Sequence, residues 1–185
     1  MKQLFLVRHG EVDFNAEGRY FGKIDVELNK NGLRQADDIA KKMIGLNINV
    51  IVASPLKRCR NTADIISGVI SAPVVLMDEF RERAYGVFEG LTRKEAKNKY
   101  PELWAKNITR IYNGAPPGGE TIKEAEARVY KGLKKIKIKY PDKIVLIVTH
   151  AFVGKIIHRF FYKLTDEEFF EYRLDNAEIV KYDFA

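Results

Sequence analysis

The sequence predicts an α/β protein, namely a three-layer α/β/α sandwich built on a mostly parallel sheet. Two observations predict this fold class. Short apolar runs rich in branched residues alternate along the chain with longer segments of helical periodicity. The runs are continuously apolar, as is typical of strands covered on both faces. Elements in that order pack as strand–helix–strand units with helices on both faces of the sheet. With 185 residues, the chain suits one domain, 1–185.

The first part of the chain alternates strands and helices, and each expected boundary has a local signal. Asn29 is typical of a helix N-cap, and Gly45 ends the helical spacing of Leu33 to Ile44. Pro55 is well placed in the first turn of a second helix. The predicted elements are, in order, a strand at 4–7, a helix between Asn29 and Gly45, a strand at 50–53, a helix from Pro55 to Ile70, and a strand at 74–77.

The second part begins with a polar segment, 80–119, that we interpret as a helical insertion over the strand ends. Its helical stretch, 92–113, is expected to break near Tyr100-Pro101. Capping boxes then begin two helices. The end of the first of these has two interpretations, because Ile136, Ile138 and Tyr140 also alternate as in a strand. The predicted elements are a loop at 115–119, a helix from Thr121, a strand at 144–148, an apolar helix through Phe161, a helix from Thr165, and a closing strand at 179–184.

Composition narrows the class of protein. No apolar stretch approaches the roughly 20 residues of a membrane span, so we expect none, and the amino-terminal residues do not resemble a signal peptide. The single cysteine, Cys59, excludes an internal disulfide framework and fits a cytoplasmic location. The formal charge of +7 suits anionic ligands. Because the lysines are spread over several expected helices without a nucleic-acid-binding motif, we expect a small anionic ligand and no nucleic acid. The oligomeric state is not indicated.

Three of the predicted strands deliver polar residues at their carboxyl ends. Arg8 and His9 follow the first strand, Arg58 comes shortly after the second, and His150 follows the strand at 144–148. Taken singly, Arg58 is about equally well explained as a helix-surface charge, and the lesser alternative for His150 is a structural imidazole that caps a strand. Carboxyl ends of parallel strands lie along one rim, where ligands of open α/β sheets bind. The coincidence therefore favours a site that holds a phosphate dianion without a metal or a cofactor.

These residues belong to a longer series of motifs that covers nearly the whole chain in order. The chain resembles the histidine phosphatase superfamily, also called phosphoglycerate mutase-like. The matching segments are Leu6–Glu11, Gly18–Gly22, Ser54–Arg58, Glu82–Arg83, Phe88–Gly90, Pro117–Glu120 and Val148–His150. The chain departs from the usual pattern at Val12, where Thr or Ser is common, and at Ala151, where Gly is common.

The resemblance implies a role for each residue at the rim. His9 is the nucleophile that becomes phosphohistidine, and Arg8, Arg58 and His150 hold the phosphoryl oxygens. Glu82 is the general acid for the leaving group and then the base that activates water. We expect neighbouring arginines to keep His9 neutral.

The role of Glu82 has a structural alternative, because the carboxylate can instead form a salt bridge with Arg81 or Arg83. We also expect nearby arginines to lower the pKa of Glu82 and a bound phosphate to raise it. The resemblance further implies a set of substrate-binding residues, although ordinary loop packing explains several of them equally well. They are Asn15, Tyr20, Phe21, Gly22, Thr149 and Ala151.

The resemblance leaves three functions open. A phosphomonoesterase transfers the phosphoryl group of a small phosphorylated metabolite to water, whereas a 2,3-bisphosphoglycerate-dependent phosphoglycerate mutase returns it to a second hydroxyl. The short chain and its Pro-Pro-Gly-Gly-Glu loop favour the small phosphatases, which include α-ribazole phosphatase. An inactive relative that binds a phosphorylated ligand or a partner is the third alternative, and the intact His9, Arg58, Glu82 and His150 argue against it. The natural substrate is not identified by the sequence.

Overall fold

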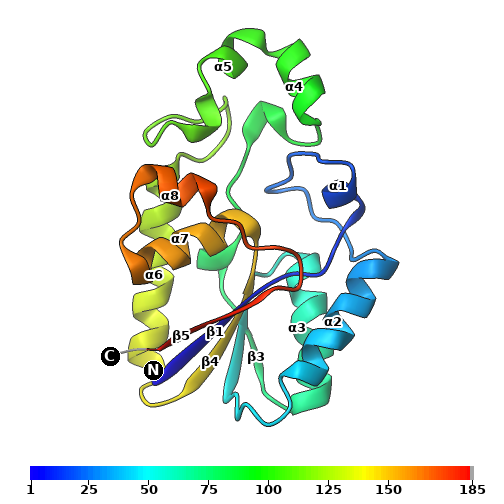
Figure 1. Cartoon of the computed structure of the whole chain (residues 1–185), viewed down its shortest axis with the longest axis vertical. Helices are drawn as coiled ribbons and strands as arrows, with labels where there is room; N and C mark the ends of the chain where they lie inside the picture. The colour runs from blue at the N-terminus through cyan, green and yellow to red at the C-terminus, as the bar shows by residue number, and fades with distance from the viewer. Residues whose placement is uncertain (184–185) are drawn as a thin grey trace.

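The computed structural model describes residues 1–183 and is built around a five-stranded sheet of order β3-β2-β4-β1-β5 (Figure 1). Four strands are parallel, and β5 pairs antiparallel with β1. The mostly parallel sheet is thus confirmed, while Phe184, the predicted end of the last strand, lies outside the described residues. The strands are β1 (Gln3–Arg8), β2 (Val50–Ala53), β3 (Val74–Leu76), β4 (Ile144–Thr149) and β5 (Ile179–Asp183).

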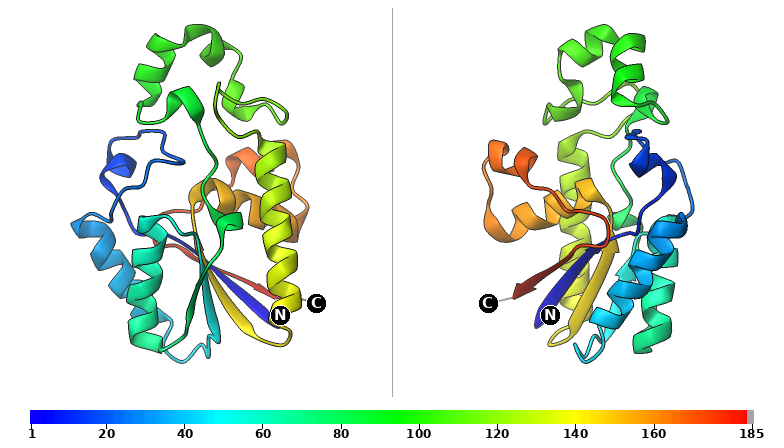
Figure 2. Two further views of the ribbon diagram at one scale, coloured as in Figure 1. Left: turned by 180° about the vertical axis from the view of Figure 1, so that it is seen from behind. Right: turned by 45° about the vertical axis from the view of Figure 1, so that its right-hand side comes forward.

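Helices cover both faces of the sheet, as a three-layer sandwich requires (Figure 2). Side chains alternate along each strand, so neighbouring residues enter different cores. In β1, Leu4 and Leu6 pack on one side, and Phe5 and Val7 pack on the other. The first core is covered by α6 (Ile122–Lys139) and α7 (Ala151–Tyr162), and the second by α2 (Lys30–Lys42) and α3 (Lys57–Ile70).

Helix α2 begins as predicted and ends earlier than predicted. The Asn29 side chain accepts a hydrogen bond from the Gly32 N–H, which confirms the N-cap. The last helical residue is Lys42, so the prediction that the helix continues to Gly45 was wrong. Leu33 and Ile44, which the spacing placed on the buried face, are 45% and 63% exposed. The buried stripe of α2 is thus narrower than the apolar spacing indicated.

Two further boundaries differ in an instructive way. Pro55 precedes α3, whose N-cap is Leu56, so the proline ends the preceding loop and is not in the first helical turn. Helix α6 continues through Lys139, so the helical interpretation was right for 136–139 and the strand alternative was wrong. Ile138 is 81% exposed, which shows how one surface isoleucine mimicked strand alternation.

Residues 80–119, the cap segment, lie beyond the carboxyl ends of the strands, at the end of the molecule opposite the amino terminus (Figure 1). As predicted, the segment breaks at Tyr100, which ends one helix and precedes the next. Its helices are α4 (Arg93–Lys99), α5 (Pro101–Ala105) and the 3-10 turns η2 (Gly86–Phe88) and η3 (Ile108–Arg110); η1 (Asp78–Phe80) leads into it. The remaining helices are α1 (Asp13–Ala16) and α8 (Asp166–Glu171). No helix within residues 1–183 is long and apolar enough to cross a membrane.

Two glycines bring the loop after β1 against the start of α2. A Cβ on Gly10 would lie 2.3 Å from the Gly32 carbonyl oxygen, and one on Gly32 would lie 2.1 Å from the Glu11 carbonyl oxygen. Real Cβ atoms do not approach backbone so closely, so only glycine fits at either position. This contact fixes the loop that directly follows the sheet rim.

We therefore predict opposite effects for two alanine substitutions in helices. Gly32→Ala forces the loop away from α2 and should lower the free energy of unfolding by about 1–3 kcal/mol. Gly68→Ala in α3 meets nothing within 4 Å. It should raise the free energy of unfolding by up to about 1 kcal/mol, because alanine is the better helix former. Urea unfolding of both variants measures this, and equal effects would contradict the close packing of Gly32.

Candidate active site

The register between β1 and β4 brings two histidines together at one rim. Arg8 lies beside Thr149 in this parallel pair, and the His9 N–H donates to the Thr149 carbonyl at 3.0 Å. The next residue of each strand is therefore a neighbour of the other, and the rings of His9 and His150 lie 5.2 Å apart, centroid to centroid. Arg58 reaches the same rim from the first turn of α3. The structure thus assembles the residues that the sequence placed there.

The His9 ring has its reactive nitrogen free of protons. Nδ1 lies 2.7 Å from the Gly10 carbonyl oxygen, which can only accept, so Nδ1 carries the proton and Nε2 keeps its lone pair. The residue is 2% exposed. Burial, followed by the charges of Arg58 and Arg8, holds the pKa of His9 well below its ordinary value. His9 is therefore a neutral imidazole, oriented through Nδ1, with the lone pair of Nε2 available.

Arg58 is fully buried and is held by three neutral acceptors. Its Nη1 donates to the Ile24 carbonyl at 2.9 Å, and its Nη2 donates to the Gly22 carbonyl at 3.1 Å. Its Nε donates to Nδ1 of His150 at 3.2 Å. Because Nδ1 of His150 accepts, its Nε2 carries the proton and donates to Ser54 Oγ at 2.8 Å. A guanidinium has five N–H groups, so two remain for a ligand.

His150 has both ring nitrogens engaged within the protein. Burial, with Arg58 next in order, holds the pKa of His150 well below its ordinary value. The structure therefore shows His150 as the neutral acceptor that orients Arg58. The predicted contact between His150 and a phosphoryl oxygen stays a prediction.

Arg8 offers a second guanidinium with a free donor. One nitrogen donates to the Leu174 carbonyl at 2.9 Å, whereas the buried Nε has no hydrogen-bond partner within residues 1–183. A buried N–H of a cation without an acceptor costs free energy unless a ligand supplies one. Together with Arg58, this leaves donors from two cations beside the lone pair of His9.

Glu82 lies at the N-terminus of α7 and not in a salt bridge. Its carboxylate accepts from the Arg83 N–H at 2.9 Å and from the Phe152 N–H at 3.3 Å. Burial raises the pKa of Glu82, and this outweighs the opposing effects of those hydrogen bonds and of Arg58 and Arg8. The prediction that the arginines dominate was therefore wrong. Burial thus makes the carboxyl group of Glu82 easier to protonate than that of an exposed glutamate, before any phosphate binds.

The arginines beside Glu82 are used elsewhere. Arg81 pairs with Asp78 at 2.6 Å. Arg83 is fully buried and donates to three carbonyl oxygens of the cap segment and its exit, those of Thr109, Gly114 and Glu120. The salt-bridge alternative for Glu82 was wrong, and Arg83 fastens the two ends of the cap segment to each other.

A chamber of about 780 Å³ opens between the cap segment and the sheet rim. Asn15, Tyr20 and Ala151, three of the predicted substrate-binding residues, line it together with Arg8. The Asn15 Oδ1 accepts from the Val12 N–H at 3.1 Å, which leaves the amide nitrogen as the group available to a ligand. Glu82 lines a second, neighbouring cavity of about 720 Å³.

The other three predicted substrate-binding residues, Phe21, Gly22 and Thr149, do not line this chamber. The Phe21 ring packs 4.8 Å from the Arg58 guanidinium carbon, and Gly22 supplies a carbonyl to the same group. Thr149 is fully buried and its hydroxyl donates to the Phe80 carbonyl at 2.9 Å. Gly22 lines the second cavity together with Glu82, whereas Phe21 and Thr149 line neither cavity and the Thr149 hydroxyl is already bonded within the fold.

One site residue was missed from the sequence. The Asn176 side chain donates to the His9 carbonyl at 2.9 Å and to Asn15 Oδ1 at 3.3 Å. It comes from the segment before β5, and no motif surrounds it. Only the antiparallel pairing of β5 with β1 brings it there, and that pairing could not be inferred locally. Among residues 1–183, no group of three or more His, Cys, Asp or Glu is arranged to hold a metal ion.

Comparison with known proteins gives a consistent result. The model of the histidine phosphatase superfamily (branch 1) matches residues 4–185. An uncharacterized phosphatase, PhoE of Bacillus subtilis, is 38% identical over all of this chain and 90% of its own length. The metal-independent phosphoserine phosphatase of Arabidopsis thaliana is 35% identical over 84% of this chain and 67% of its own. The solved structure of a putative α-ribazole-5′-phosphate phosphatase from Escherichia coli superposes with a TM-score of 0.89, at 22% identity, over 97% of this chain and 89% of that one.

The buried neutral state of His9 predicts a pH dependence of stability. In the unfolded chain a histidine takes up a proton near pH 6.5, whereas folded His9 does so only at much lower pH. Below pH 6.5 the unfolded state therefore binds more protons, and stability falls by up to about 1.4 kcal/mol per pH unit for each such histidine. Urea unfolding at pH 7, 6 and 5 should show a smaller fall for His9→Asn than for the unmodified protein. Equal falls would contradict a neutral His9.

Proposed function

We propose that this chain, which belongs to the histidine phosphatase superfamily and is a phosphatase, hydrolyses small phosphomonoesters through a phosphohistidine on His9. The observation that supports this most directly is the proton on Nδ1 of His9, because it leaves Nε2 ready to attack. Two guanidiniums beside it keep unused donors. Their charge allows the site to hold a phosphate dianion without a metal.

In the first step, Nε2 of His9 attacks phosphorus and the P–O bond to the leaving group breaks. Glu82, protonated, gives its proton to the departing oxygen. The phosphoryl oxygens gain charge in the transition state, and the free N–H groups of Arg8 and Arg58 stabilise it. The raised pKa of Glu82 supports this role, since it increases the protonated fraction near neutral pH.

In the second step, water takes the place of the leaving oxygen. Glu82, now ionised, accepts a proton from water while the water oxygen attacks phosphorus and the P–N bond breaks. Phosphate leaves, His9 regains its lone pair, and Glu82 is protonated again. We assign to His150 the orientation of Arg58 through both steps, because its Nδ1 accepts from Arg58 Nε.

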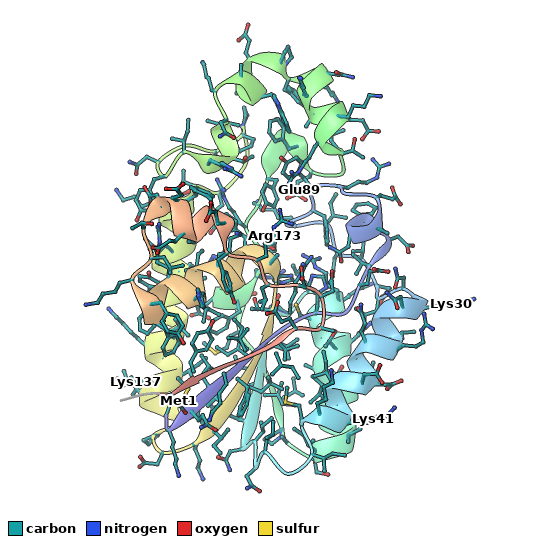
Figure 3. All side chains as sticks on the ribbon, viewed as in Figure 1. Met1, Lys30, Lys41, Glu89, Lys137 and Arg173 are labelled. Carbon is teal, nitrogen blue, oxygen red and sulfur yellow. The ribbon has the colours of Figure 1, made fainter. Side chains whose placement is uncertain are left out.

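The chamber supports a leaving group that carries a second negative charge. Arg93, Arg110 and Arg173 are exposed, and within the described residues none of them has an ion-pair partner; Figure 3 labels Arg173 below the cap segment. Asp175 is the single acidic residue lining the chamber. The basic residues lining it are Arg8, Arg83, Arg93, Arg110, Lys155 and Arg173. Phosphoserine, the substrate in the name of the Arabidopsis relative, carries such a carboxylate.

The remaining parts of the proposal follow from the sequence. We place the protein in the cytoplasm, which the buried free thiol of Cys59 supports. We propose no nucleic-acid partner and no metal or cofactor. The cap segment 80–119 is proposed as an insertion within a single domain, 1–185, and its lining of the chamber supports a role in enclosing the leaving group.

Phosphate release from a panel of esters in excess EDTA tests this function. The panel contains p-nitrophenyl phosphate, phosphoserine, phosphoethanolamine, 3-phosphoglycerate and α-ribazole phosphate. We expect metal-independent release, with phosphoserine preferred over phosphoethanolamine, which lacks the carboxylate. His9→Ala should lower turnover at least about a thousandfold and abolish the acid-labile phosphoenzyme. Conversion of 3- to 2-phosphoglycerate that requires 2,3-bisphosphoglycerate, with little release, would instead establish the mutase. Absence of both activities would support the inactive relative.

The acid role of Glu82 predicts a dependence on the leaving group. Glu82→Gln should lower kcat/KM for phosphoserine by about 10²–10⁴-fold, because an alkoxide needs a proton to depart. For p-nitrophenyl phosphate the loss in kcat/KM should be much smaller, since p-nitrophenolate leaves unprotonated. Use of kcat/KM isolates the first step from the later hydrolysis of phosphohistidine. Equal losses for both esters would contradict the acid role.

A further inference from the structure

The two backbone oxygens that hold Arg58 belong to an irregular segment. Residues 22–25 lie in neither helix nor strand, so no ladder of hydrogen bonds fixes the carbonyls of Gly22 and Ile24. Besides the bonds from Arg58 itself, the segment is attached to α3 where the Asp25 carboxylate accepts from the Lys57 N–H at 2.7 Å. The orientation of Arg58 therefore depends on whatever else holds this segment in place.

Glu89 supplies that support from the cap segment. Its carboxylate accepts from the N–H groups of Gly22 at 2.8 and 3.0 Å, Lys23 at 3.1 Å and Tyr85 at 2.8 Å, and the Ile24 N–H lies at 3.5 Å. Within residues 1–183 no cation forms a salt bridge with it. Figure 3 labels Glu89 where the cap segment meets the body of the molecule. Apart from the bond from Tyr85, the Glu89 carboxylate thus accepts hydrogen bonds from the backbone of the segment 22–25.

We propose that Glu89 is a positioning residue that acts on the phosphate site through Arg58. Glu89 fixes the N–H groups of Gly22–Ile24, the carbonyls of that segment fix the two Nη atoms of Arg58, and the remaining N–H groups of Arg58 point to the phosphoryl oxygens. Glu89 itself does not touch the substrate. This inference rests on the proposed function, and it links the cap segment to the affinity of the site for phosphate.

The chemistry of the contact requires a carboxylate and not merely a side chain of that size. The Gly22 N–H is shared between both carboxylate oxygens. In Glu89→Gln one of these positions becomes an NH₂ group, whichever way the amide is turned, and it then faces an N–H donor. Gly22 cannot move away freely, because a Cβ there would already lie 2.0 Å from the Arg83 carbonyl oxygen. Because Gly22 cannot shift alone, Glu89→Gln should displace the whole segment 22–25 without changing the size of the side chain at position 89.

Orthovanadate binding, measured by calorimetry, tests the proposal without relying on turnover. We expect Glu89→Gln to weaken binding about tenfold, as for the loss of one hydrogen bond to a charged group. The same loss should appear as a raised KM for p-nitrophenyl phosphate. Glu168→Gln is the matched control, because Glu168 also accepts from backbone, at Thr165, but in the capping box of α8. It should alter the melting temperature and leave vanadate affinity unchanged.

A double-mutant cycle decides whether Glu89 acts through Arg58. In the Arg58→Ala background, Glu89→Gln should cause no further loss of vanadate affinity, because the group it positions is gone. Additive losses, or an unchanged affinity of the single variant with a lowered melting temperature, would overturn the proposal. If the unmodified protein binds vanadate but releases no phosphate from any ester, the proposed function fails while the cycle still tests Glu89.

Discussion

A fully buried guanidinium with no carboxylate bonded to it is the constraint on which the rest of this site depends. Desolvation of Arg58 costs several kcal/mol, and two carbonyl oxygens and an imidazole offset only part of it. Each acceptor must be held in place by the fold. This explains why the irregular segment 22–25 is bonded both to α3, through Asp25, and to the cap segment, through Glu89. A dianionic ligand completes the balance of charge. Burial lowers the pKa of Arg58, because the guanidinium loses its hydration inside the protein.

Burial, followed by the charge of Arg58, keeps the two histidines neutral, and the roles proposed for them require neutrality. The neutral imidazole of His9 has a lone pair available for phosphorus, and that of His150 accepts a hydrogen bond from Arg58. A carboxylate hydrogen-bonded to either ring would favour the imidazolium and destroy both functions. The Glu82 carboxylate instead accepts from the N–H groups of Arg83 and of Phe152, the latter at the start of α7. The separation of this carboxylate from the two imidazoles is therefore what the proposed chemistry requires.

The sequence predicted what is local and what parallel topology enforces. Continuous apolar runs identified the strands, and the common rim of parallel strands placed His9 beside His150. Prediction from the sequence failed where a contact joins distant segments through backbone atoms, because any residue type can supply a backbone acceptor. The tautomer of His150 depends on Arg58, and the support of His9 by Asn176 depends on the pairing of β5. Exposed apolar residues such as Ile138 misled for another reason, since periodicity does not record which face is covered.

Glu82 shows why electrostatic reasoning from composition alone gave the wrong sign. Two arginines near a carboxylate lower its pKa, and that inference is right for each pair. Burial acts on the same group in the opposite direction and is larger, because removing water costs the ionised form its solvation. Burial therefore makes Glu82 easier to protonate before substrate arrives, and in the proposed mechanism a bound dianion raises its pKa further. Once the leaving group has taken the proton, the ionised carboxylate sits beside two cations and the N-terminus of α7, which stabilise it as the base for water. In the proposed mechanism one residue serves both steps, because burial favours the acid while the local cations favour the ionised base.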